Sequence, residues 1–170
     1  AGQLPSADAV LVYDDDHYYM GGVIAQLLAD SGKAVTLVTP GPEVSCWTQN
    51  TMEQHRIEKA LLDRGVTLIA KHTLSGVASD SVSFACNTTD RALSIEAPGL
   101  VMVTLRAPMS SLYFSLAGEA QEQIDELPFG LLRIGDCMAP NTIAAAVYDG
   151  HRAAREMDNW PDPDIVPFKR

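Results

Sequence analysis

The stretch VLVYDDDHYYMGGVIAQLLADSGKAVTLV, residues 10–38, has the pattern of a strand, a helix and a second strand. Residues 9–13 form an apolar run of strand length. Residues 34–38 are apolar and rich in β-branched side chains, which is typical of a parallel strand covered on both faces. Such a strand–helix–strand crossover is nearly always right-handed. The stretch therefore predicts an α/β fold, a three-layer Rossmann-like domain with a mainly parallel sheet.

The helix of this unit is predicted over residues 21–30, and Ser31-Gly32 ends it. Its larger apolar side chains recur at helical spacing and are expected to face the sheet: Val23, Ile24, Leu27 and Leu28. In nucleotide-binding α/β proteins the junction before such a helix carries glycines, so that backbone N–H groups reach a phosphate. Here the junction carries three aspartates, residues 14–16, and only Gly21-Gly22 remains of a glycine-rich turn.

One interpretation of this junction is a Mg²⁺-dependent phosphatase. Asp14 and Asp16 have the Asp-x-Asp spacing that places one carboxylate for attack and a second for proton transfer. Tyr18 stands where a Thr or Val is usual, and no second acid follows Asp136 before Asp149. No clear lysine lies on a loop between these acids to neutralise a phosphoryl group.

A second interpretation is a nucleotide site, and a third is a turn that binds no ligand. An NAD(P)H-binding reductase module would use Gly21 and Gly22, but G-x-G-x-x-G is absent. The second strand ends in Thr39-Pro40-Gly41 instead of the acid or arginine that binds a ribose or its phosphate. In the third interpretation the turn binds nothing, and its aspartates are solvated or stabilise the helix N-terminus.

The chain beyond this unit reads as further elements of the same domain. A helix is predicted from about residue 50 to 64, and a third parallel strand at residues 66–70. The alternation in SVSFACN predicts an antiparallel meander over three short segments: residues 72–77, 81–87 and 92–96. Residues 100–105, LVMVTL, form another buried strand.

The C-terminal part repeats the order of strand, turn and helix. A strand over residues 130–134 ends in Gly135-Asp136, and a helix is predicted over residues 143–157. An acidic segment precedes them and is expected to be a solvated helix or loop; its carboxylates include Glu119, Glu122, Asp125 and Glu126. The tail from Trp160 is expected to be extended or disordered.

Composition limits the classes of partner. The net charge of −10 disfavours nucleic acids and anionic membranes, which are bound through clustered Lys and Arg. No apolar run approaches the ~20 residues that span a bilayer. The three cysteines are widely spaced and the four histidines share no metal-ligand spacing, so we expect no metal site and a reducing, cytoplasmic setting.

Three later segments, taken in order after the first crossover, carry a resemblance to a known family: SCWTQNTMEQHRIEKALLDRGV (residues 45–66), LVMVTLRAPMSSLY (100–113) and IGDCMAPNTIAAAVYDGHRAAREMD (134–158). Together they resemble the C-terminal nucleotide-binding-like region of the trimethylamine dehydrogenase / 2,4-dienoyl-CoA reductase family of NADH:flavin oxidoreductases. The resemblance covers about residues 9–159. YDDDHYYMGG is similar to the amine dehydrogenase branch, in which the nucleotide turn is degenerate.

The resemblance implies a division of the chain and a set of missing partners. Residues 9–106 would be a degenerate pyridine-nucleotide-binding-like domain, 107–159 a connection plus the last strand and helix of an FAD/ADP-binding-like domain, and 160–170 a tail. It also implies that FMN and a [4Fe–4S] cluster belong to an upstream TIM barrel and not to this chain. An upstream FAD-like domain would share Gly135 and Asp136, with ADP as a ligand there, and an electron-transfer flavoprotein would be a partner. The chain by itself is then expected to be inactive, with no catalytic residue.

Overall fold

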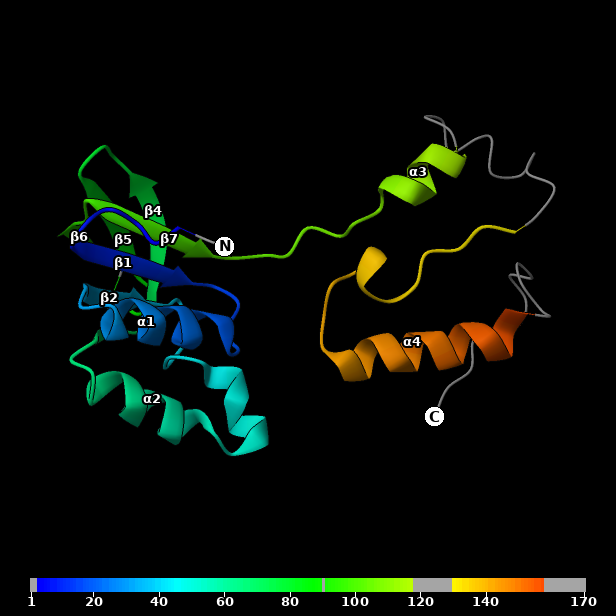
Figure 1. Ribbon diagram of the computed structural model, residues 1–170, viewed down its shortest axis with the longest axis horizontal. Coiled ribbons are helices and arrows are strands. Elements are labelled where there is room, and N and C mark those ends of the chain that lie inside the picture. The colour runs from blue at the N-terminus through cyan, green and yellow to red at the C-terminus, as the bar shows by residue number, and fades with distance from the viewer. Residues whose placement is uncertain (1–2, 90, 118–129, 158–170) are drawn as a thin grey trace. The chain divides into compact units, whose positions relative to one another are not determined.

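The computed structural model describes residues 3–89, 91–117 and 130–157, and it divides the chain into two units. The first unit is Ala1–Leu105 and the second is Arg106–Arg170 (Figure 1). The acidic carboxylates predicted between residues 119 and 126 and the tail from residue 160 lie outside the described residues. No helix in the described ranges is long and apolar enough to cross a membrane.

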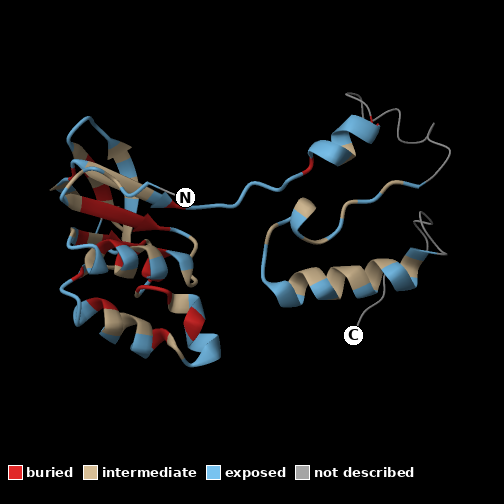
Figure 2. Ribbon diagram, in the orientation of Figure 1, coloured by how far each residue is buried: buried red, intermediate tan, exposed pale blue. Residues whose placement is uncertain are grey.

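The first unit is built on a four-stranded parallel sheet, as the sequence predicts. Its strands are β1 (Ala9–Asp14), β2 (Ala34–Val38), β3 (Thr67–Ile69) and β7 (Gly99–Val103). They lie in the order β3-β2-β1-β7, with β1 between its two neighbours. Because β1 is paired on both sides and covered on both faces, nearly all of its residues are buried (Figure 2).

Helices α1 (Met20–Asp30) and α2 (Gln54–Leu62) belong to one layer of this unit. The face that α1 buries overlaps the predicted one only in part: Leu28 and the partly buried Ile24 pack on the core, whereas Val23 and Leu27 do not. Leu28 is 1% exposed, but Val23 and Leu27 are 54% and 55% exposed. The buried residues of α1 are Leu28 and three small residues, Gly21, Gly22 and Ala25. Gly21, at its start, lets α1 approach the end of β1 closely.

The helix predicted from residue 50 to 64 is also shorter than expected. A 3₁₀ helix, Cys46–Thr51, comes first, and α2 begins only at Gln54. Met52 lies between them with a left-handed φ of 60°, which a continuous α-helix does not allow. The stretch predicted as one helix is therefore divided at Met52 into a 3₁₀ helix and α2.

The predicted meander is confirmed and covers the other face of the parallel sheet. Its antiparallel strands are β4 (His72–Val77), β5 (Ser81–Cys86) and β6 (Ala92–Glu96). Val82 and Phe84 alternate inward on β5 and are buried with Leu11 and Tyr13 of β1. The rings of Tyr13 and Phe84 lie 6.0 Å apart between centroids.

The second unit contains α3 (Ser111–Ala117), the 3₁₀ turn Gly135–Cys137 and α4 (Ile143–Glu156). The strand predicted over residues 130–134 is not formed. A strand needs a neighbour for its backbone N–H and C=O groups, and the described part of this unit has no strand to pair with it. Among the unit's described residues only Ser110 and Ala117 are buried, so these helices enclose almost no core.

Candidate functional site

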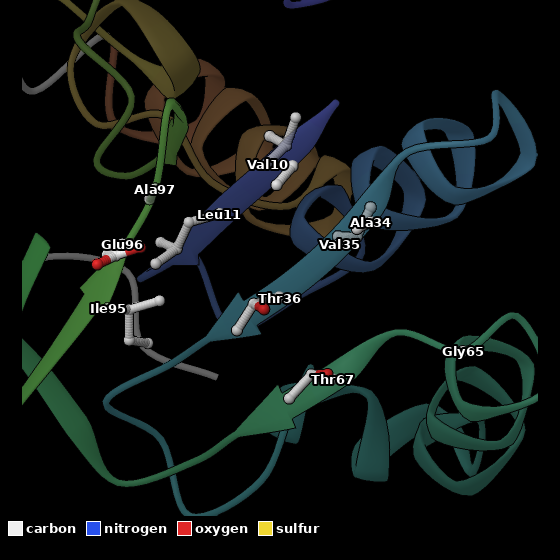
Figure 3. Close-up of a pocket in the computed structure, with 11 residues that line it drawn as sticks. Val10, Leu11, Ala34, Val35, Thr36, Gly65, Thr67, Ile95, Glu96 and Ala97 are labelled. Atoms are coloured by element: carbon white, nitrogen blue, oxygen red, sulfur yellow. The ribbon is translucent and has the colours of Figure 1, made fainter. Parts of the chain in front are cut away.

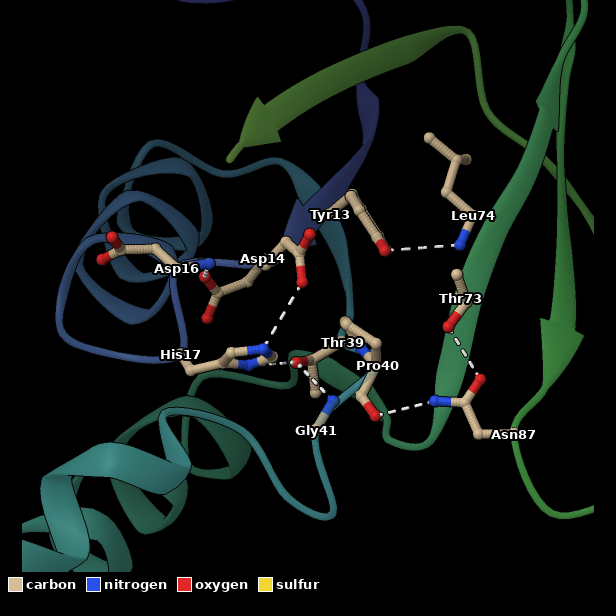
Figure 4. A network of polar contacts seen from close by, with 11 residues as sticks. Tyr13, Asp14, Asp16, His17, Thr39, Pro40, Gly41, Thr73, Leu74 and Asn87 are labelled. Carbon is tan, nitrogen blue, oxygen red and sulfur yellow. Dashed lines mark hydrogen bonds and ion pairs between the residues drawn. The ribbon is translucent and has the colours of Figure 1, made fainter. Parts of the chain in front are cut away.

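The junction between β1 and α1 lies at the carboxyl edge of the parallel sheet, where ligands of open α/β sheets bind. Asp14 ends β1 and is 0% exposed. Its Oδ1 accepts the backbone N–H of Asp16 at 3.1 Å, and the backbone N–H of His17 donates to the same carboxylate. Figure 4 shows the carboxylate folded back into its own turn. The donors of the turn are therefore used within the chain.

Gly21 is the residue of α1 that faces this carboxylate. A Cβ at Gly21 would lie 2.3 Å from Cγ and 2.4 Å from Oδ2 of Asp14. Oδ2 has no hydrogen-bond partner within the described ranges. Gly21 thus makes room for a side chain of the protein itself, at a place where a nucleotide-binding turn makes room for a phosphate.

Burial raises the pKa of the Asp14 carboxyl group from 3.8 to about 6, although the backbone N–H groups of Asp16 and His17 and the nearby His17 ring lower it in part. The group is still mostly ionised at neutral pH. An isolated charge in this position is costly, and the N–H donors of the turn offset only part of that cost.

His17 covers the end of β2. Its backbone is left-handed, with φ of 60°, and its Nδ1 lies 3.4 Å from Oγ1 of Thr39. Its Nε2 lies 3.4 Å from Oδ1 of Asp15. The ring also lies 6.4 Å from that of Trp47, centroid to centroid. A Cβ at Gly41 would come within 3.2 Å of Nδ1, so the imidazole fills the space beside this loop.

The loop after β2 is closed by its own hydrogen bonds. Thr39 is buried, and its Oγ1 accepts the N–H of Gly41 at 3.2 Å. The side-chain amide of Asn87 donates to the carbonyl of Pro40 at 2.9 Å (Figure 4). The end of β2 therefore presents neither the acid nor the arginine that would bind a ribose or its phosphate.

A cavity of about 140 Å³ lies elsewhere in the unit, beside the amino-terminal halves of β1 and β2 (Figure 3). Its polar side chains are Thr36, Thr67 and Glu96. It is smaller than the 300–1,000 Å³ typical of ligand sites and lies at the wrong end of the strands for a dinucleotide.

The arrangement required by a Mg²⁺-dependent phosphatase is not formed at Asp14 and Asp16. Asp14 is inaccessible to a phosphate ester, and its carboxylate is turned into the junction. In residues 3–89, 91–117 and 130–157, no three His, Cys, Asp or Glu side chains are grouped to hold a metal ion.

Gly135 and Asp136 lie in the second unit, at the turn before α4. Gly135 has a φ of +59°, and its N–H donates to Oδ2 of Asp149 at 3.2 Å. Oδ1 of Asp136 accepts the N–H of Asn141 at 3.3 Å. Thr142 caps α4 through its side chain. The turn is thus organised by its own residues, with one carboxylate oxygen of Asp136 already engaged.

Two features of the structure have no clear signal in the sequence. The guanidinium of Arg133 lies 4.6 Å from the ring centroid of Tyr113 and 5.0 Å from that of Phe114, which joins the residue 130–134 segment to α3. Cys86, at the end of β5, has a pKa lowered to about 7, chiefly by the hydroxyl of Thr89 and then by the backbone N–H groups of Thr88 and Thr89. The Arg133 stacking and the lowered pKa of Cys86 both depend on side-chain contacts that cannot be predicted from the spacing of residues in the sequence.

Comparison with known proteins finds relatives among amine-oxidising enzymes. Histamine dehydrogenase from Rhizobium sp. 4-9 is 39% identical and superposes with a TM-score of 0.82, over 95% of this chain and 25% of that one. A 6-hydroxypseudooxynicotine amine oxidase from Pseudomonas geniculata N1 is 32% identical with a TM-score of 0.74, over 85% of this chain and 21% of that one. Dimethylamine dehydrogenase from Hyphomicrobium sp. is 24% identical over 95% of this chain and 24% of its own length.

The chain therefore spans about a quarter of the length of these relatives. No protein-family model matches it. Thioredoxin reductase from T. acidophilum, at 20% identity and a TM-score of 0.59, shows a likeness of fold alone. The Rossmann-like architecture that the sequence predicts is thus confirmed.

Proposed function

Since the chain is a homologue of amine dehydrogenases of the trimethylamine dehydrogenase family, as its sequence predicts, we propose that it is one region of a larger oxidoreductase that oxidises an amine. Two enzymes to which it is similar are named for acting on amines, and the similarity extends over 95% and 85% of the chain. In that enzyme this region has a structural and interface role, and it binds no reduced nicotinamide.

The observation that carries the absence of nicotinamide binding in this proposal is the buried Asp14 carboxylate in the β1–α1 turn. A pyrophosphate needs free N–H groups at this turn, and Asp14 accepts those of Asp16 and His17. Bringing a pyrophosphate beside an ionised, buried carboxylate would add a repulsion of several kcal/mol. The same geometry makes an NAD(P)H-binding reductase module the weaker alternative, and it removes the accessible nucleophile that a phosphatase would need.

Exposed apolar surface supports an interface role. Met20, Val23 and Leu27 follow one another at helical spacing on α1 and are all about half exposed. Trp47, in the 3₁₀ helix after β2, is also exposed. The second unit has very little buried surface of its own among its described residues. We assign these apolar faces to contacts with other domains of the parent enzyme.

The cofactors of the family belong, in this proposal, to the rest of the parent enzyme. Cys46, Cys86 and Cys137 are all free, and the described residues offer no group that fits an iron–sulfur cluster. An ADP moiety at the second unit would depend on the Asp136 side of the turn, since the N–H of Gly135 is already donated to Asp149. An upstream barrel would bind FMN, and an electron-transfer flavoprotein would accept the electrons.

Calorimetric titration of the 170-residue chain with NADH, NADPH and ADP tests the nucleotide part of the proposal. We expect no heat of binding for either reduced nicotinamide up to millimolar concentration, and at most weak binding of ADP. Micromolar binding of NADH or NADPH would refute the proposal and favour the reductase alternative. For the parent enzyme, bleaching of flavin absorbance by an added amine, without NADPH, is the expected signature.

A further inference from the structure

The junction between β1 and α1 carries both halves of an anion-binding turn. One half is a set of backbone N–H groups, of which those of Asp16 and His17 point at a common acceptor. The other half is the glycine at the start of α1, which leaves the space that a phosphate would fill. In this chain both halves contact the same group, the carboxylate of Asp14.

The contacts of Asp14 are those of a bound anion. Its Oδ1 receives the N–H of Asp16 at 3.1 Å. Its Cγ and Oδ2 lie 2.3 and 2.4 Å from where a Cβ at Gly21 would be, and Oδ2 has no hydrogen-bond partner in the described ranges. Among the described residues, no lysine or arginine forms an ion pair with this fully buried carboxylate. The position is therefore explained by the donors of the turn and by the glycine, not by a salt bridge.

We propose that the Asp14 carboxylate is an intramolecular substitute for the phosphate of a nucleotide, and that this one side chain makes the turn unable to bind pyrophosphate. The inference rests on the proposed function, which it deepens by naming the residue that excludes the ligand. In this view Gly21 is needed because a side chain at this position would collide with Asp14. The ligand class that the turn would accept without Asp14 is a pyrophosphate or the diphosphate of ADP.

Asp15 provides a matched control for charge. It carries the same charge on the same turn, but its side chain is 49% exposed and faces His17, not the N–H donors. If net negative charge alone repels a phosphate, D14G and D15N should act alike. If occupancy of the donors is responsible, only D14G should release them.

The test is a titration of wild type, D14G and D15N with inorganic pyrophosphate and with ADP, followed by the backbone amide NMR signals of Asp16, His17 and Gly21. We expect D14G to bind both probes at least tenfold more tightly than wild type, with the largest shifts at these three amides, and D15N to match wild type. Equal gains in both variants would mean that charge repulsion is the cause, and they would overturn the proposal. No gain in a folded D14G would overturn it as well.

A second readout covers the case in which D14G does not fold. D14N keeps the shape of the side chain but removes its charge, so the amide protons of Asp16 and His17 should move upfield as their hydrogen bonds weaken. D15N should leave both signals in place. Unchanged signals in D14N would show that the amides are not bonded to Asp14. Failure of the proposed function is seen separately, as binding of NADH or NADPH by the wild-type chain.

Discussion

Asp14 and Gly21 are in such close contact that position 21 accepts no side chain: a Cβ there would lie 2.3 Å from Cγ of the aspartate. The pair joins the end of β1 to the first turn of α1. Gly21 also belongs to the face of α1 that is buried, together with Gly22, Ala25 and Leu28. The chemistry of the turn and the packing of the helix thus depend on the same contact.

The first prediction concerns this contact. Gly21→Ala should lower the free energy of unfolding by about 2–3 kcal/mol, because an added methyl group in a filled space forces the backbone or Asp14 to move. Gly22→Ala is the control in the same helical turn. Its Cβ would meet Cγ2 of Ile57 at 3.1 Å, the end of a side chain that can shift, so the loss should be below about 1 kcal/mol. Urea unfolding of both variants measures the difference, and equal losses would contradict the contact.

The second prediction concerns the rotation of α1. Leu28→Ala should destabilise the first unit by about 2–5 kcal/mol, because Leu28 is 1% exposed in the main core. Leu27→Ala should change the stability by less than about 0.5 kcal/mol, because Leu27 is 55% exposed. A large loss of stability in L28A and almost none in L27A, measured by urea unfolding, would confirm the observed rotation. Similar losses at both positions would favour the face predicted from the sequence.

The third prediction is a pH dependence caused by Asp14. The pKa of its carboxyl group is raised from 3.8 to about 6 by folding, so between these values the folded chain binds more protons than the unfolded chain. Stability then falls as the pH rises from about 4 to about 6, and it levels off above the folded pKa. The loss should be about 3 kcal/mol at most, from the shift of about two pKa units.

Asp14→Asn isolates this contribution, since the other titrating groups remain in both proteins. The free energy of unfolding of D14N minus that of wild type should rise between pH 4 and pH 7. Chemical unfolding at a series of pH values gives this difference directly. A constant difference over the whole range would mean that folding does not shift the pKa of Asp14.

The fourth prediction concerns thiol reactivity. Hydrogen bonds from Thr89 and Thr88 lower the pKa of the Cys86 thiol to about 7, whereas burial raises the pKa of Cys46. Cys86 should therefore react before Cys46 with iodoacetamide at pH 7, with a rate that rises through a midpoint near 7. Thr89→Val should move that midpoint upward, because the hydroxyl donor is lost. Peptide mapping by mass spectrometry identifies the modified residue, and faster labelling of Cys46 would refute the assignment.

Much of the fold could be read from local pattern. The buried runs at β1 and β2, the alternation in β5 and the glycine after α1 are signals carried within a few residues, and the parallel sheet and the meander follow from them. The strand expected at residues 130–134 shows the limit of such signals. An apolar run becomes a strand only when a neighbouring strand pairs with it, and the described part of the second unit has none.

By itself, the sequence determined the order of strands and helices in the first unit, the family to which the chain is related and the absence of G-x-G-x-x-G from the β1–α1 junction. These follow from residue type and spacing along the chain. Only the tertiary structure decided how the β1–α1 junction is filled. The contact between Asp14 and Gly21, the covering of the β2 edge by His17 and the rotation of α1 onto its small residues all depend on the distance between a strand end and a helix start. That distance is set by close packing in three dimensions, and it cannot be inferred from the spacing of residues along the chain.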